Sequence, residues 1–186
     1  MSLDVNVTWD RSGIAALETG PMKGALRRAL RKAGATALRD MRSEATKRIR
    51  TRKKIKVRYI RRAMTLRRAK GSDVAGMEWA VDVDGTPVPL VAYPHRVTKK
   101  GVSVEVNRGK RTLLAGSFLA TMKSGHKGVF RRRGKARLPI DELRGSRPVD
   151  ALLHKGEADA VAERGGSSFT ATLSRVLPLE IAKAAE

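Results

Sequence analysis

The hydrophobic positions of this chain change their spacing along the sequence, and each spacing predicts an element. At the amino end, Leu3, Val5 and Val7 alternate with polar residues, which is typical of a half-buried strand, and the alternation continues to Trp9. A short helical turn is expected in residues 11–20. One apolar stripe with a spacing of three or four residues then predicts a long amphipathic helix over residues 22–50. Its members are Met22, Leu26, Leu30, Ala33, Ala37, Met41, Ala45 and Ile49.

The middle of the chain mixes a short helix with strands. Residues 51–56 are nearly all basic and are expected to form a loop, and a second helix should run from Val57 through residue 68. Glycine, serine and aspartate then indicate a turn at residues 71–73. Residues 77–83 and 102–106 alternate as strands, with a turn at Asp84 and Gly85 between them. Pro87 and Pro89 place the stretch between these strands at a sheet edge or in a loop.

The last third of the chain combines a hairpin with helices. Residues 117–123 and 129–133 are expected to be two arms joined by a turn at Gly125, His126 and Gly128, which would project from the body. Residues 138–143 are expected to turn helical, and Pro148 to open a short helix. Residues 157–185 have a helical composition that Gly165, Gly166 and Pro178 should break or kink.

This order of elements predicts an α+β fold. We expect a long N-terminal amphipathic helix packed on an antiparallel β-sheet, with C-terminal helices. Residues 1–145 would form the main domain. Residues 146–186 would form a helical segment that packs on the same domain or on a neighbouring subunit.

Composition excludes several classes of protein. The 186 residues contain no cysteine, so there is no disulfide framework, thiol nucleophile or cysteine metal site. No apolar run approaches the ~18 residues of a membrane span, and no secretory signal is visible at the amino end. We therefore expect a soluble protein made in the cytosol.

Candidate catalytic and ligand-binding residues carry little weight. His95, His126 and His154 are far apart in the sequence, and the pair Asp82 and Asp84 is better explained as surface charge beside a turn. Residues 109–112 resemble the end of a phosphate-binding loop, but position 104 is Val where that motif needs Gly, so a basic hairpin turn is the better interpretation. The sequence predicts no enzyme, no cofactor and no metal site.

The strongest physical signal is the net charge of +22. Residues 23–70 hold 20 Lys and Arg against two acids, and residues 96–137 hold 13 against one. Such blocks bind either the phosphates of DNA, without reading bases, or an acidic neighbouring protein. A membrane surface fits less well because the stripe of the long helix lacks Trp and Phe. The candidate contact residues are Arg52, Lys53, Lys54, Lys56, Arg58, Arg61, Arg62, Arg67, Arg68, Lys99, Lys100, Lys123, Lys127, Arg131, Arg132, Arg133, Lys135 and Arg137.

One stretch is more distinctive than charge. Residues 118–132 read Phe-Leu-Ala-Thr-Met-Lys-Ser-Gly-His-Lys-Gly-Val-Phe-Arg-Arg, and Leu-Pro-Ile-Asp-Glu-Leu follows at residues 138–143. Arg-Arg-Ala-Met at 61–64, Pro-Val-Pro-Leu at 87–90 and the lysine-containing segment at 98–106 precede them. In this order the segments resemble the bacteriophage minor tail protein Z family, the tail-completion proteins of lambda-like phages. The resemblance spans residues 22–145.

The resemblance implies a structural virion protein at the head-proximal end of the tail, assembled in the host cytoplasm. Such a protein would form a homo-oligomeric ring, six-fold to match the tail tube, and would take part in head–tail joining. Its partners would be the tail tube, a tail terminator and head-closure or connector proteins, close to the path of the DNA. The family brings no catalytic residues. A free, non-specific nucleic-acid-binding protein remains the alternative that the charge alone allows.

Overall fold

A computed structural model describes residues 2–7, 20, 22–68, 74 and 77–185 of the chain. The predicted helical turn before Gly20, the extension of the first strand to Trp9 and the turn at residues 71–73 lie outside these described residues. The rest of the chain forms the expected mixture of helices and antiparallel strands. The fold class predicted from the sequence, α+β, is confirmed.

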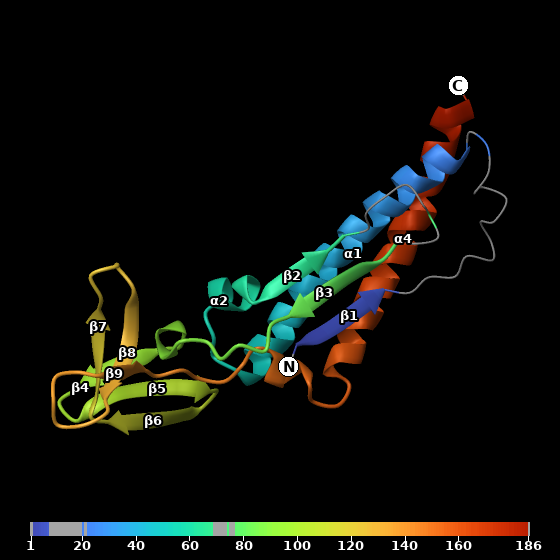
Figure 1. Cartoon of the computed structure of the whole chain (residues 1–186). Coiled ribbons are helices and arrows are strands. Elements are labelled where there is room, and N and C mark those ends of the chain that lie inside the picture. Colours follow the sequence, from blue (N-terminus) through green and yellow to red (C-terminus); the bar gives the residue numbers. More distant parts are fainter. Residues whose placement is uncertain (1, 8–19, 21, 69–73, 75–76, 186) are drawn as a thin grey trace.

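The molecule is elongated, with helices at one end and two small sheets at the other (Figure 1). At the helical end, α1 (Met22–Arg52) lies along α4 (Glu157–Ala185), and a first sheet packs against both helices. At the other end lie a second and a third sheet. The short elements α2 (Val57–Arg62), η2 (Leu90–Ala92) and α3 (Val149–Leu152) come from the segments that run between the two ends.

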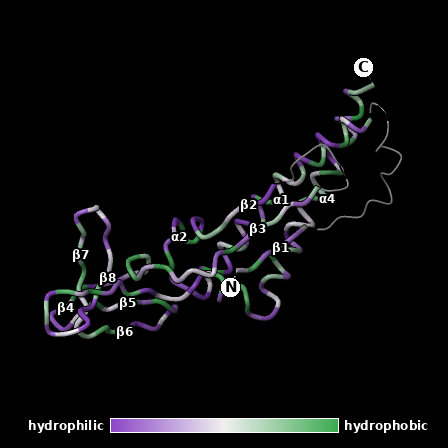
Figure 2. The backbone as a smooth tube through the Cα atoms, viewed as in Figure 1, coloured by the Kyte–Doolittle hydropathy of each residue, from purple (hydrophilic) through white to green (hydrophobic). Residues whose placement is uncertain are grey.

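The long helix α1 forms because its apolar stripe has somewhere to pack. Leu26, Leu30, Met41 and Ile49 are fully buried, and so are most of the alanines between them. Hydrophobic and hydrophilic residues alternate along α1 and α4 in Figure 2, as two amphipathic helices require. The predicted helix over residues 22–50 is confirmed and extends to Arg52, so Thr51 and Arg52 are helical rather than part of the predicted loop.

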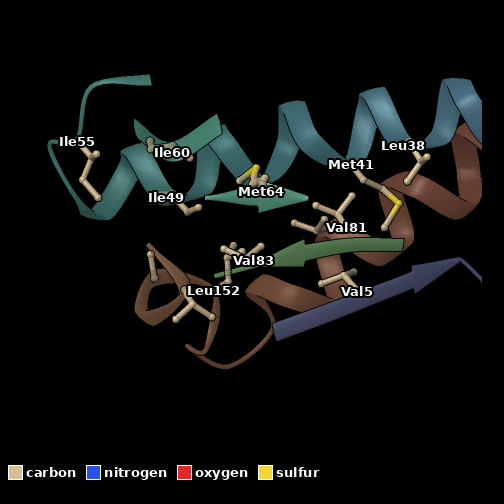
Figure 3. Close-up of a cluster of buried hydrophobic side chains, with 14 of the residues drawn as sticks. Val5, Leu38, Met41, Ile49, Ile55, Ile60, Met64, Val81, Val83 and Leu152 are labelled. Atoms are coloured by element: carbon tan, nitrogen blue, oxygen red, sulfur yellow. The ribbon is translucent and has the colours of Figure 1, made fainter. Parts of the chain in front are cut away.

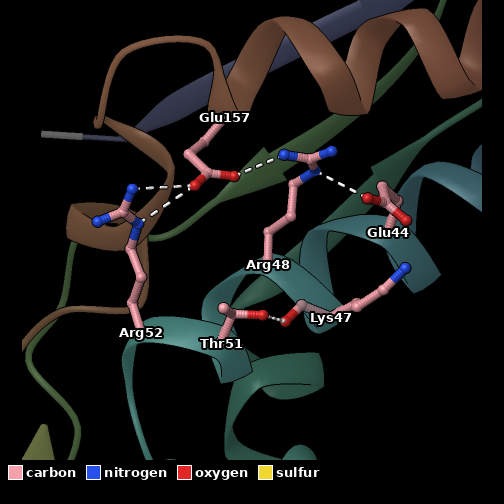
Figure 4. Close-up of polar contacts among 6 residues, drawn as sticks. All are labelled: Glu44, Lys47, Arg48, Thr51, Arg52 and Glu157. Atoms are coloured by element: carbon pink, nitrogen blue, oxygen red, sulfur yellow. Dashed lines mark hydrogen bonds and ion pairs between the residues drawn. The ribbon is translucent and has the colours of Figure 1, made fainter. Parts of the chain in front are cut away.

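Ion pairs join α1 to α4 at three points. From the amino end of α1 they are Arg28 and Lys32 with Glu180, Asp40 with Arg164, and Arg48 and Arg52 with Glu157 (Figure 4). Residue numbers rise along α1 as they fall along α4, so the helices are antiparallel and the charges fix their register. The distances run from 2.6 Å for Arg28 Nε to Glu180 Oε2 up to 3.2 Å for the Asp40 pair.

The first sheet has the order β1-β3-β2. Its centre is β3 (Trp79–Val83), with β1 (Leu3–Val7) and β2 (Met64–Arg67) antiparallel on either side. The prediction of helix through residue 68 is therefore wrong, because α2 ends at Arg62. Alternate residues Met64 and Leu66 instead pack toward the core, and Met64 pairs with Val83 of the central strand.

The core lies between this sheet and the helices. In Figure 3, Met41 and Ile49 of α1 point toward Val81 and Val83 of β3, and Leu152 of α3 closes the cluster. With few aromatic residues available, aliphatic side chains fill most of it.

The second sheet contains β4 (His95–Thr98), β5 (Gly101–Asn107) and β6 (Lys110–Ala115), each antiparallel to the next. The predicted strand at residues 102–106 is confirmed, and Gly109, with φ of +76°, sits in the predicted basic hairpin turn. The third sheet contains β7 (Ser117–Thr121), β8 (Lys127–Arg132) and β9 (Ile140–Glu142). Among the described residues the fold thus has three small sheets instead of the single sheet expected.

Two further predictions need correction. Residues 138–143 are not helical, because Ile140–Glu142 adds to the third sheet beside β8, with Phe130 opposite Glu142. The C-terminal helix α4 is continuous over Gly165, Gly166 and Pro178, so the predicted break is wrong. The short helix after Pro148 is confirmed as α3. Pro87 lies outside regular structure and Pro89 makes only an isolated bridge, as predicted.

Candidate interaction surfaces

The hairpin of β7 and β8 projects from the body as predicted (Figure 1). Its turn is closed by hydrogen bonds from Met122 N to His126 O at 2.8 Å and from Gly125 N to Met122 O at 2.9 Å. Gly125 has φ of +79°, a left-handed conformation that favours glycine. Gly128 lies within β8 opposite Ala120 rather than in the turn. A Cβ there would come within 2.8 Å of both Glu142 Oε1 and Phe130 Cζ, so a close packing contact explains that glycine.

Two of the three arginines at the base of the hairpin have internal partners. Arg133 donates two hydrogen bonds of 2.8 Å to Asp141, which raises its own pKa and lowers that of the carboxyl. Arg132 lies over the ring of Phe118, at 5.5 Å from the centroid, and donates to Arg137 O at 2.6 Å. The remaining basic side chains of this region have no hydrogen bond or ion pair with another described residue: Lys123, Lys127, Arg131, Lys135 and Arg137.

Much of the first basic block also holds the protein together. Lys54 binds Glu105 of β5, and Arg52 binds Glu157 of α4. Further predicted contact residues have internal partners too: Lys53 with Asn107, Lys56 with Val91 O, Arg58 with the Tyr59 ring, and Arg67 with Asp4 and Asp82. The donated hydrogen bonds from Lys54 and Arg48 lower the pKa values of Glu105 and Glu157. The main role of these basic side chains is therefore to link secondary-structure elements of the protein to one another.

Other predicted contact residues are exposed and do not link elements in this way. Lys99 and Lys100 form the turn between β4 and β5, and Arg68 directly follows β2. Arg61 and Arg62 are exposed on α2. No hydrogen bond or ion pair links these five side chains to another residue that the structure describes.

A hollow of about 400 Å³ lies where α1 ends, and we call it the basic hollow. Its lining residues are Ser43, Thr46, Lys47, Arg50, Thr51, Val57, Arg61 and Arg108, four of them cationic and none acidic. Of the four cations, only Arg61 is among the contact residues predicted from the sequence. Lys47 and Arg50 follow Ser43 at helical spacing on one face of α1, a signal available in the sequence. Arg108 comes from the turn after β5, and only the tertiary fold brings it there.

A second cleft, of about 610 Å³, separates α2 from the hairpin turn. It is lined by Arg58 and Arg62 on one side and by Lys127 of the hairpin on another, with Asp84 and Glu142 among them. Glu142 also bonds His126 in the turn, at 2.7 Å from Nε2. Charges of both signs and the prolines at 87 and 89 line this cleft, which suits a protein segment better than a polyanion.

The described residues contain no cluster of three or more His, Asp and Glu side chains that could hold a metal ion. His95 bonds the carbonyl of Tyr93 at 2.9 Å, and His126 bonds Glu142, so these two rings have structural roles. None of the helices in the described part of the chain is both long and apolar enough to span a membrane.

The model of one protein family, prophage minor tail protein Z, matches residues 17–178. The chain belongs to this family. It is therefore a structural protein of a phage tail and a component of the virion, and the family is not a known class of enzyme. The resemblance noted in the sequence is confirmed over a longer span than residues 22–145. Searches of curated proteins and of solved structures gave no match.

Proposed function

We propose that this protein completes the tail at its head-proximal end. It forms a closed ring, six-fold to match the tail tube, and takes part in joining the tail to the head. The observation that carries the proposal is the match of residues 17–178 to minor tail protein Z. Its partners in this role are the tail tube, the tail terminator and the head-closure or connector proteins.

The architecture supports a mechanical role. A ring requires two different faces on each subunit that fit together and close. Ion pairs at three points fix α1 against α4, so this end of the molecule can transmit force without a change of register. Within the described residues, each of the three sheets ends in edge strands, whose outer backbone groups can pair with a neighbouring subunit. The cleft beside the hairpin, lined by both signs of charge, fits a segment of such a neighbour.

The position of the ring near the genome gives the exposed Lys and Arg side chains a role in binding. In the head-proximal position the ring surrounds the path of the DNA. The bases without internal partners then face either the DNA end or acidic surfaces of neighbouring proteins. Catalysis has no part in this proposal, because positioned surfaces, rather than a reacting group, do the work.

In vitro joining tests the role directly. Tails assembled without this protein are mixed with filled heads, with and without the purified chain, and joined particles are counted by electron microscopy. We expect joining to require the chain. Equal joining in both mixtures would refute the role in tail completion.

Light scattering after size exclusion tests the ring. We expect a species of six times the 20.3 kDa chain mass, alone or with tail tube protein. A monomer that stays out of tails, while binding duplex DNA, would favour the alternative of a free nucleic-acid-binding protein.

A further inference from the structure

We propose that the basic hollow at the end of α1 binds the phosphate backbone of duplex DNA without sequence preference. Its cationic residues are Lys47, Arg50, Arg61 and Arg108. The inference deepens the proposed function and rests on it for the source of the DNA, since the genome passes the head-proximal end of the tail. The binding itself can be measured on the purified protein.

Three separate parts of the fold supply these cations. Lys47 and Arg50 lie on the last turns of α1, Arg61 is on α2, and Arg108 is in the turn after β5. Arg108 donates from Nε to the carbonyl oxygen of Arg50 at 2.7 Å. This bond holds the Arg108 guanidinium over the end of α1 and leaves its two terminal nitrogens available to a ligand.

The lining of the hollow contains no carboxylate, unlike the surface of α1 that faces α4. There, Arg28 and Lys32 near the start of α1, and Arg48 and Arg52 near its end, all form ion pairs with glutamates. No ion pair to a described acid occupies the side chains of the four cations in the hollow. The acids Asp40 and Glu44, which line the adjoining hollow beside Lys47, are paired with Arg164 and Arg48. Repulsion among the four cations is electrostatically unfavourable, and an anionic ligand relieves it.

The lining decides which anion fits. Protein interfaces have apolar or aromatic centres, but Val57 is the one apolar residue lining this hollow. Single-stranded nucleic acid needs aromatic side chains on which bases stack, and none lines it. Guanidinium groups match phosphate oxygens in a bidentate manner, and the hydroxyls of Ser43, Thr46 and Thr51 add hydrogen-bonding groups. These features together favour the backbone of a duplex.

The test is the binding of fluorescent 20-base-pair duplexes of two unrelated sequences, by anisotropy, over a series of NaCl concentrations. The variant Arg50→Gln with Arg61→Gln removes two charges from the hollow. The matched control, Arg175→Gln with Lys183→Gln, removes two exposed charges near the C-terminal end of α4, which lies beside the start of α1 and away from the hollow (Figure 1). Circular dichroism melting establishes that all variants are folded.

We expect the hollow variant to bind both duplexes about tenfold or more weakly than wild type. The slope of log affinity against log salt should fall by about 2, since each phosphate contact contributes about 0.9. The control variant should keep nearly the full slope, and Arg50→Lys with Arg61→Lys should also keep it, because the charges remain.

Three results would overturn the inference: no duplex binding by the wild-type protein, an equal loss in the hollow and control variants, or tighter binding of a single strand than of the duplex. Each of these leaves the head–tail joining assay unaffected. Conversely, a protein that binds duplex through the hollow but is dispensable for joining would refute the proposed function and not the site.

Discussion

Gly34 of α1 lies directly under the indole ring of Trp79, and replacing it with alanine tests how tightly the helix and sheet are packed. A Cβ at position 34 would lie 2.0 Å from Cε2 and 2.2 Å from Nε1 of Trp79. Carbon atoms in good contact are about 3.5–4.0 Å apart, so the ring would have to move by roughly 1.5 Å. Trp79 is only 2% exposed, and its ring centroid lies 5.3 Å from that of Phe169 on α4.

Two opposing effects set the magnitude. Alanine is favoured over glycine inside a helix by about 1 kcal/mol. Overpacking a close-packed interior costs about 1–3 kcal/mol and sometimes more, and the required movement of Trp79 places this site at the upper end of that range. We therefore expect Gly34→Ala to lower the free energy of unfolding by about 2 kcal/mol. For a chain of this size the midpoint of thermal unfolding should fall by about 4–8 °C.

Gly166→Ala in α4 is the matched control, because a Cβ there meets no atom within 4 Å. It should raise the free energy of unfolding by up to about 1 kcal/mol. Urea unfolding followed by circular dichroism measures both variants. If Gly34→Ala is as stable as wild type, or gains stability as Gly166→Ala does, the packing argument is wrong. In a Trp79→Leu background, which removes the indole, the penalty of Gly34→Ala should largely disappear.

Two further predictions concern charged residues. Hydrogen bonds from Arg28 and Lys32 lower the pKa of Glu180 from 4.5 to about 2, so the unfolded state binds more protons than the native state between these values. The contribution of Glu180 to stability should therefore be complete well above pH 4.5 and be lost as the pH falls through 4.5 toward 2. Urea unfolding at each pH should show a shallower fall for Glu180→Gln, and an identical pH profile would contradict the assignment. Replacing the cluster Arg131, Arg132 and Arg133 with Ser should reduce the number of tails that join heads in vitro, and undiminished joining would exclude a role for this cluster.

The ion pairs within the protein change how its excess of Lys and Arg is interpreted. Several cations that looked like ligand contacts in the sequence, such as Lys54 and Arg67, bind carboxylates of other elements. The cations that remain available to a partner include those of the basic hollow, several bases of the hairpin region, and the exposed Lys99 and Lys100. Because exposed ion pairs contribute little each, the paired bases matter chiefly for the arrangement of elements.

Local periodicity was enough to predict the elements whose neighbours are close in sequence. The stripe from Leu26 to Ile49 identified α1, and the alternation around Val81 and Val104 identified β3 and β5. The glycine-containing turn between two arms identified the projecting hairpin. The residues 118–132 were also distinctive enough to indicate the family without a structure.

Pairings between distant segments could not be predicted in this way. Met64–Arg67 and Ile140–Glu142 are strands because they pair with the backbone groups of β3 and β8. Segments of four and three residues are too short for their own sequence to predict such a pairing. The basic hollow could not be predicted from local sequence either, because its cations come from three separate parts of the fold. The sequence determined that this protein is a cationic α+β scaffold of a phage tail. Only the tertiary structure decided which cations meet a carboxylate and which gather without one, because Coulomb energy depends on distances in space and not on spacing along the chain.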